Sequence, residues 1–231
     1  MRSARLDEAL LYFVCEARPG GANPGPLLDA ALRGGVDIVQ MREKAEQSDE
    51  QLIELAAPFR RAAAEHGALF ILNDRPDLVA ACGADGAHVG QDDAPVTEAR
   101  QSAGPGALIG LSTHSVEQIE AAADAADEAR PDQISVGPVW ETPTKPGRAA
   151  TGLNLVELAD RRLSVPWFAI GGIDEASIGA VVGAGGRRAV VVRAIRDAAD
   201  PERTAAALRR ALGGDAQPRQ PAGDVPAERD G

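Results

Sequence analysis

Short apolar runs alternate with Ala-rich stretches of helical periodicity along most of the chain. Runs of this length predict buried strands, and the stretches between them predict amphipathic helices. The predicted strands are residues 10–15, 38–42, 69–72, 86–89, 108–111, 133–139, 167–170 and 189–192. The predicted helices are residues 27–33, 49–65, 76–82, 95–102, 116–128, 153–162, 175–182 and 201–212. The pattern is a succession of eight strand–helix units.

Eight such units with short connections favour an α/β fold, a single (βα)8 TIM barrel. The alternative is an open flavodoxin-like or Rossmann sheet, but no GxGxxG motif follows the first strand. We expect one catalytic barrel domain over residues 1–212. Residues 213–231 contain almost no apolar side chains, so we expect a disordered C-terminal tail there.

Two of the helices carry clear start signals. Ser48 and Gln51 form a capping-box pattern, and Asp200 precedes a proline that suits the first helical position. Pro58 lies within the helix that Ser48 begins, and we expect it to kink that helix or divide it in two.

Composition and charge exclude several classes of partner. The 231 residues carry a net charge of −11 with no offsetting basic block, which argues against nucleic acid or an anionic membrane as the main partner. No apolar segment approaches the length of a membrane span, and the N-terminus lacks a signal-peptide core. Cys15 and Cys82 are too few for a disulfide framework, so we expect a reduced, cytoplasmic compartment.

The second predicted strand ends in an unusual set of polar residues. Strand alternation would put Gln40, Arg42 and Lys44 on one face and Glu43 on the other, towards the helices. Two cations and an amide inside a compact domain are costly to desolvate unless an anion meets them. The alternative is a strand end that emerges into solvent, where such charges are ordinary.

Polar and Gly-rich residues follow most of the other predicted strands as well. These are Asn73-Asp74, Gln91-Asp92-Asp93, Ser112-Thr113-His114, the segment from Glu141 to Lys145, Gly171-Gly172, and Arg193. In a barrel, these positions lie at the C-terminal ends of the strands, where barrel enzymes carry their active sites. The sequence therefore predicts a site at this end.

Some of these residues suggest specific roles. Asp74 with either Asp92 or Asp93 suits a divalent cation such as Mg²⁺, although Asp74 could instead cap the following helix. The loop over residues 142–152 is long and suits a cover over an anionic group. Gly171-Gly172 allows backbone N–H groups to approach a phosphate. We expect His88 and His114 to be structural, because neither is part of a credible triad or zinc spacing.

Taken in order, the motifs resemble those of the thiamine phosphate synthase family. The segments that carry the resemblance are 40–44 (QMREK), 73–74 (ND), 88–93 (HVGQDD), 110–112 (GLS), 137–139 (GPV), 142–145 (TPTK) and 170–173 (IGGI). The resemblance runs in order from the first predicted strand through the eighth and leaves only the first few residues and the tail outside. The resemblance implies a (βα)8 enzyme that joins hydroxymethylpyrimidine diphosphate to a thiazole phosphate, with Mg²⁺, and releases pyrophosphate.

The resemblance also implies residue roles. The pyrimidine diphosphate would be held by Gln40, Arg42, Lys44, Asn73, Ser112 and Lys145, with Glu43 inside the same substrate-binding motif, and Arg42, Lys44, Ser112 and Lys145 would be catalytic. Asp74 and Asp93 would hold Mg²⁺. The thiazole phosphate would meet Thr142, Thr144, Gly172, Val192 and Arg193. Arg193 departs from the family, which often has Ser there, so we expect altered contacts. The implied reaction is dissociative, and the 142–152 loop would exclude water.

Other functions remain open at this stage. A thiazole tautomerase-like relative would lack the full diphosphate set, and an isomerase or aldolase barrel would need a mid-strand catalytic Lys or Glu. A non-catalytic phosphate-ligand-binding barrel would bind without releasing pyrophosphate. The expected partners are small-molecule substrates rather than nucleic acid or membrane, and homo-oligomer formation stays open.

Overall fold

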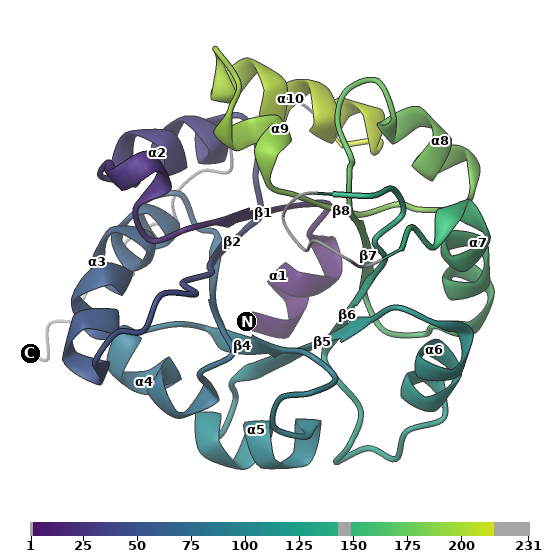
Figure 1. The fold of residues 1–231 in the computed structure, drawn as a ribbon, viewed down its shortest axis with the longest axis horizontal. Helices are drawn as coiled ribbons and strands as arrows, with labels where there is room; N and C mark the ends of the chain where they lie inside the picture. The colour runs from purple at the N-terminus through teal and green to yellow at the C-terminus, as the bar shows by residue number, and fades with distance from the viewer. Residues whose placement is uncertain (1, 143–148, 215–231) are drawn as a thin grey trace, which may run out of the picture.

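The computed structural model describes residues 2–142 and 149–214, which form a closed parallel barrel with strand order β1-β2-β3-β4-β5-β6-β7-β8 (Figure 1). The strands are β1 Leu11–Cys15, β2 Ile38–Met41, β3 Leu69–Asn73, β4 Gly86–Val89, β5 Leu108–Thr113, β6 Gln133–Val136, β7 Trp167–Ile170 and β8 Ala189–Val191. The first strand pairs with the last, with Leu11 opposite Ala189. The predicted (βα)8 barrel is confirmed.

Helices surround the barrel (Figure 1). They are α2 Gly25–Arg33, α3 Asp49–Glu65, α4 Val79–Cys82, α5 Val96–Ala103, α6 Val116–Ala123, α7 Gly152–Arg162, α8 Ile178–Gly183, α9 Arg193–Arg196 and α10 Pro201–Ala211, with α1 Arg2–Glu8 before the first strand and short 3-10 turns at Pro19–Gly21 and Pro76–Leu78. No helix in the described ranges is both long and apolar enough to cross a membrane.

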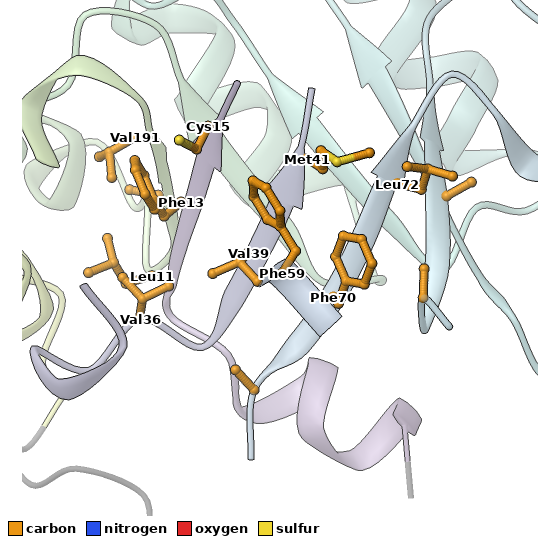
Figure 2. Close-up of a cluster of buried hydrophobic side chains, with 14 of the residues drawn as sticks. Leu11, Phe13, Cys15, Val36, Val39, Met41, Phe59, Phe70, Leu72 and Val191 are labelled. Atoms are coloured by element: carbon orange, nitrogen blue, oxygen red, sulfur yellow. The ribbon is translucent and has the colours of Figure 1, made fainter. Parts of the chain in front are cut away.

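Alternation along each strand divides the apolar side chains between two layers. Outward-facing residues such as Phe13, Val39 and Met41 belong to the large layer between strands and helices, where Phe59 of α3 also packs (Figure 2). Inward-facing residues, including Val14, form a second and smaller cluster inside the barrel. The period of two therefore sends every second strand residue into the barrel, where a site can be built.

Helix α1 covers the N-terminal end of the barrel and crosses its axis in Figure 1. Leu6 is buried in the inner apolar cluster. Arg2 and Arg5 reach Asp85, which precedes β4, at 2.7 Å and 3.4 Å. The sequence pattern did not predict this helix, because Leu6 is the one large apolar residue in its seven positions.

Several predicted boundaries move for local reasons. β5 runs two residues further than expected, to Thr113, because it pairs with β6 up to Val136. β6 ends before the Gly137-Pro138 bond, since proline has no N–H to extend the ladder. α6 ends at Ala123, where the acidic Ala-rich sequence offers no large apolar side chain to bury.

The helix start signals are confirmed. Ser48 and Gln51 make the reciprocal bonds of a capping box, and Asp200 accepts the N–H of Arg203 at 3.0 Å. Pro58 lies inside α3, which continues as one helix from Asp49 to Glu65, so of the two expected outcomes division does not occur. The C-terminal tail predicted for residues 213–231 lies outside the described residues from 215 onwards.

Candidate active site

A cavity of about 350 Å³ opens at the C-terminal ends of the barrel strands. It brings together residues from β1 through α9, which are far apart in the sequence. Among the residues singled out in the sequence, its lining includes Gln40, Arg42, Asn73, Ser112, Thr142, Gly172, Val192 and Arg193. The structure therefore places polar groups from both halves of the chain around one space large enough for a small ligand.

The polar end of β2 contributes to the cavity in part. Gln40 is 4% exposed and, like Arg42, lines the cavity. The N–H of Arg42 still donates to the carbonyl of Cys15 at 2.9 Å, so the strand geometry extends one residue past Met41. The alternation ends there, which explains why Lys44 is exposed and does not line the cavity.

Glu43 lies outside the cavity. Its Oε1 accepts the backbone N–H groups of Lys44 and Ala45, both at 2.8 Å. This carboxylate stabilises the turn that follows β2. Its inclusion in the substrate-binding motif stays a prediction.

The two predicted metal ligands lie after neighbouring strands. Asp74 follows β3, forms an ion pair with Lys44, and has a φ of 61°, the one positive φ among the described non-glycine residues. Asp93 follows β4, and its Oδ2 accepts the N–H of Gly90 at 2.7 Å. Positive φ at a non-glycine residue is uncommon and often marks a functional position. No cluster of three or more metal-ligating residues occurs within the described ranges.

Ser112 is held in a buried polar cluster across β4, β5 and β6. His88 Nε2 lies 3.0 Å from Ser112 Oγ and 3.3 Å from Ser135 Oγ, and the two serine residues are paired in register. All three line the cavity. His114, also in the lining, has its Nδ1 hydrogen-bonded to the carbonyl of Gly137. Since a carbonyl only accepts, that nitrogen carries the proton.

The opposite wall is formed by the ends of β7 and β8. Gly171 and Gly172 have φ values of 102° and 68°, and a Cβ on Gly172 would lie 2.8 Å from the Cβ of Trp140. Only glycine therefore suits this turn without strain. Val192 and Arg193 follow β8 and line the cavity, and the charge of Arg193 contributes to the lowered pKa of Asp197 in the same wall. The close backbone approach and the guanidinium of Arg193 suit an anionic group.

Two carboxylates in this wall already have partners within the protein. Asp174 Oδ1 accepts the N–H of Ser177 at 2.9 Å. Asp197 forms an ion pair with Arg196, whose Nε lies 2.7 Å from Oδ1. This contact holds the pKa of Asp197 below its ordinary value. Asp197, which is paired with a cation, therefore repels an incoming phosphate less than its formal charge suggests.

Some sequence-predicted residues lie outside the described part of the chain. Thr144 and Lys145 fall within residues 143–148, together with most of the predicted covering loop. Other lining residues were not predicted as site residues: Tyr12, Val14, Ser135, Ile173, Asp174 and Asp197, with His88 and His114 expected to be structural. Tyr12 and Val14 were hidden in an apolar run, where only the inward register of β1 would have identified them.

Comparison with known proteins places this cavity in a family context. The family model described as thiamine monophosphate synthase matches residues 11–195. The match covers all eight strands. The chain belongs to the thiamine monophosphate synthase family.

Similar proteins agree with this assignment. A thiamine-phosphate synthase from Saccharopolyspora erythraea is 50% identical over 216 residues, covering 91% of this chain and 96% of the relative. One from Mycobacterium sp. strain KMS is 48% identical over 216 residues, covering 90% and 94%. Members of the thiamine monophosphate synthase family thus match this chain over nearly their whole length.

Solved structures agree at the level of the fold and the family. A thiamine phosphate pyrophosphorylase from Pyrococcus furiosus superposes with a TM-score of 0.78 at 27% identity, covering 90% of this chain and 97% of the other. A 3-hexulose-6-phosphate synthase superposes with a TM-score of 0.63 at 21% identity, covering 87% and 99%. The second likeness shows the shared barrel alone.

Proposed function

We propose that this chain is a thiamine-phosphate synthase, a transferase that joins an aminopyrimidinylmethyl diphosphate to a thiazole phosphate and releases pyrophosphate. The observation that carries the proposal is the convergence of Arg42, Asn73 and Ser112 with Gly172 and Arg193 on one cavity, in a chain of the thiamine monophosphate synthase family. One anion-binding wall suits the diphosphate, and the other suits the phosphate of the second substrate.

The diphosphate would lie against the ends of β2 to β5. Arg42 supplies a permanent cation at the cavity wall, and Asn73 and Ser112 supply groups that can donate to phosphate oxygens. Lys44 lies next to this wall through its ion pair with Asp74. From the family resemblance, Lys145 would complete this group.

Mg²⁺ would bind beside this wall, since Asp74 and Asp93 follow β3 and β4 without lining the cavity themselves, and two carboxylates alone make a partial site. Asp74 and Asp93 would hold it, with the remaining ligands from water and diphosphate oxygens, as Mg²⁺ commonly requires. When bound, the ion would neutralise charge on the departing diphosphate. The constrained backbone at Asp74 and the bond from Gly90 to Asp93 already orient both carboxylates.

The reaction needs positioning more than a nucleophile from the protein. The bond between the methylene carbon and the diphosphate oxygen breaks, and its electron pair leaves with pyrophosphate. The ring nitrogen of the thiazole supplies the electron pair for the new bond to carbon. Arg42 would stabilise charge on the leaving group, while Gly172 and Arg193 would fix the second substrate by its phosphate.

A direct assay tests this function. Purified protein is mixed with both substrates and Mg²⁺, and thiamine phosphate and pyrophosphate are quantified together. We expect equal amounts of the two products. Folded protein that binds the diphosphate but forms neither product would contradict the proposal and indicate a non-catalytic binding barrel instead.

Asp93→Asn is expected to raise the Mg²⁺ concentration for half-maximal rate by about tenfold or more, because a neutral amide is a weaker ligand for a hard cation. The measurement is the initial rate over a Mg²⁺ titration at saturating substrates. Asp92→Asn, an equally acidic neighbour that the resemblance leaves out of the site, is the matched control. Equal effects of the two variants would reject the assignment of Asp93.

Arg193→Ser is expected to raise KM for the thiazole phosphate by about tenfold, since a charge-assisted hydrogen bond contributes roughly 1.5–3 kcal/mol. KM for the pyrimidine diphosphate should stay within about twofold, because that substrate would meet the other wall. Steady-state kinetics with each substrate varied in turn provides the measurement. A rise confined to the diphosphate KM would place the two substrates the other way round.

A further inference from the structure

Beneath the cavity, three polar side chains are buried inside the barrel. Tyr12 of β1 is 1% exposed, Gln40 of β2 is 4% exposed, and Gln133 of β6 is 1% exposed. Tyr12 and Gln40 also line the cavity floor, whereas Gln133 lies behind them. Burying three polar groups costs free energy unless they are paired, so their arrangement calls for an explanation.

The Tyr12 hydroxyl connects the other two side chains. Gln40 Nε2 donates to Tyr12 Oη at 2.6 Å. Gln133 also interacts with this hydroxyl, although neither of its amide atoms reaches full hydrogen-bond geometry with a described residue. Burial raises the pKa of Tyr12, an effect that Gln133 and Gln40 only partly offset, so the phenol keeps its proton. Its oxygen therefore accepts from Gln40 Nε2, and the lowering effect of Gln133 on this pKa is that of a second group on the donor side.

The surroundings hold the phenol in place. The ring of Tyr12 packs edge-on against Phe168, with ring centroids 5.5 Å apart and an interplanar angle of 84°. Gly110 leaves room for Gln133, because a Cβ there would lie 2.7 Å from Gln133 Nε2. Displacement of the Tyr12 ring, and with it the phenol oxygen, away from Gln40 would thus require repacking of the barrel interior.

The direction of the Gln40 amide follows from this contact. An amide has one donating and one accepting end of nearly equal size, and its direction is set by its partners. The NH₂ group of Gln40 points to Tyr12. Its carbonyl oxygen is therefore available to a ligand in the cavity. A buried acceptor discriminates against any ligand group that cannot donate to it.

We propose that Tyr12, backed by Gln133, is a positioning residue that turns the carbonyl oxygen of Gln40 towards the cavity and thereby selects a heterocycle presenting an amino N–H. The inference rests on the proposed function, in which the first substrate is an aminopyrimidine. A ring carrying an oxo group in place of the amino group would set two acceptors against each other. The arrangement of Tyr12, Gln133 and Gln40 therefore discriminates amino from oxo heterocycles.

The test compares the aminopyrimidine diphosphate with its oxo analogue, in which an oxygen replaces the amino nitrogen. Tyr12→Phe removes the hydroxyl and keeps the ring, so the Gln40 amide can turn over. We expect the amino-to-oxo ratio of kcat/KM to fall about tenfold, the loss expected for one buried hydrogen bond. The change should appear in KM for the diphosphate substrate, with kcat and the KM for thiazole phosphate within about twofold.

Two further variants separate positioning from packing. Phe168→Leu disturbs the same ring contact without touching a polar group, so it should lower stability and change the ratio much less than Tyr12→Phe does. In a Gln40→Ala background, Tyr12→Phe should have no further effect on the ratio, since the group that it orients is gone. An equal fall in Phe168→Leu, or an undiminished effect without Gln40, would overturn the proposal.

The remaining outcomes are also decisive. An unchanged ratio in folded Tyr12→Phe overturns the proposal. Should that variant not fold, Gln133→Leu carries the test, and a ratio equal to that of the unmodified protein overturns the proposal. If the unmodified protein forms no product, the proposed function fails, and calorimetric Kd values for the two diphosphates replace kcat/KM. If Tyr12→Phe no longer binds the amino compound more tightly than the oxo analogue, these Kd values still support the positioning role.

Discussion

Replacing Arg42 with alanine is expected to lower kcat/KM for the pyrimidine diphosphate by about 10²–10³-fold, the loss typical for a donor aimed at developing charge. Arg42 is half-buried in the cavity wall, at a position fixed by the last ladder bond of β2. Its guanidinium can hold two phosphate oxygens at once, which no neighbouring residue in this wall can do. Steady-state kinetics with saturating thiazole phosphate measures the effect.

A matched control removes the same charge elsewhere. Arg161 lies on α7, where its side chain is 65% exposed and pairs weakly with Glu157. Arg161→Ala should keep kcat/KM within about twofold, because exposed pairs contribute little and charges beyond a Debye length are screened. Arg42→Lys should recover part of the loss by restoring charge without the bidentate geometry. Equal activity of Arg42→Ala and the unmodified protein would remove Arg42 from the mechanism.

Replacing Asp37 with alanine is expected to lower the free energy of unfolding by about 3–5 kcal/mol, the cost of breaking a buried ion pair on one side. Asp37 is 2% exposed, and its Oδ2 accepts the N–H of Leu10 at 2.8 Å and Nη1 of Arg209 at 2.6 Å. It thus joins β2, the entry of β1 and the last helix, α10. Urea denaturation followed by circular dichroism measures the loss.

The control for this prediction is an exposed pair that also involves α10. Glu202 of α10 meets Arg33 of α2 at 2.8 Å, and both side chains are about half exposed. Glu202→Ala should cost at most about 1 kcal/mol, as is usual for surface ion pairs. If both variants had the same midpoint as the unmodified protein, the buried pair would contribute nothing to stability. A changed m value would instead point to a different denatured state.

The barrel was predictable because its signals are local and repeated. Each strand is a short apolar run bounded by turn residues, and the polar groups after the strands converge once the sheet is closed. The same reasoning placed Gln40 and Arg42 on the inner face. The prediction that Lys44 shares this face was wrong, because the extended backbone ends after Arg42 and alternation no longer applies there.

Other parts of the site depend on contacts that a sequence pattern does not encode. Tyr12 lies within an apolar run, and its role becomes visible only through its bond to Gln40. Ser135 and His88 meet Ser112 because of the registers of β4, β5 and β6, which are set by the whole barrel. The metal and substrate roles of Asp74, Asp93, Thr144 and Lys145 stay predictions from the family resemblance.

The division of each strand between two layers restricts how this site can change through insertions and deletions. A single-residue insertion at the start of β2 would turn Met41 into the cavity and push Gln40 and Arg42 into the apolar layer beneath α3. Ligand contacts and helix packing would be lost in the same event. Viable variation in this strand is therefore confined to substitutions, whereas length variation is accommodated in the loops beyond it.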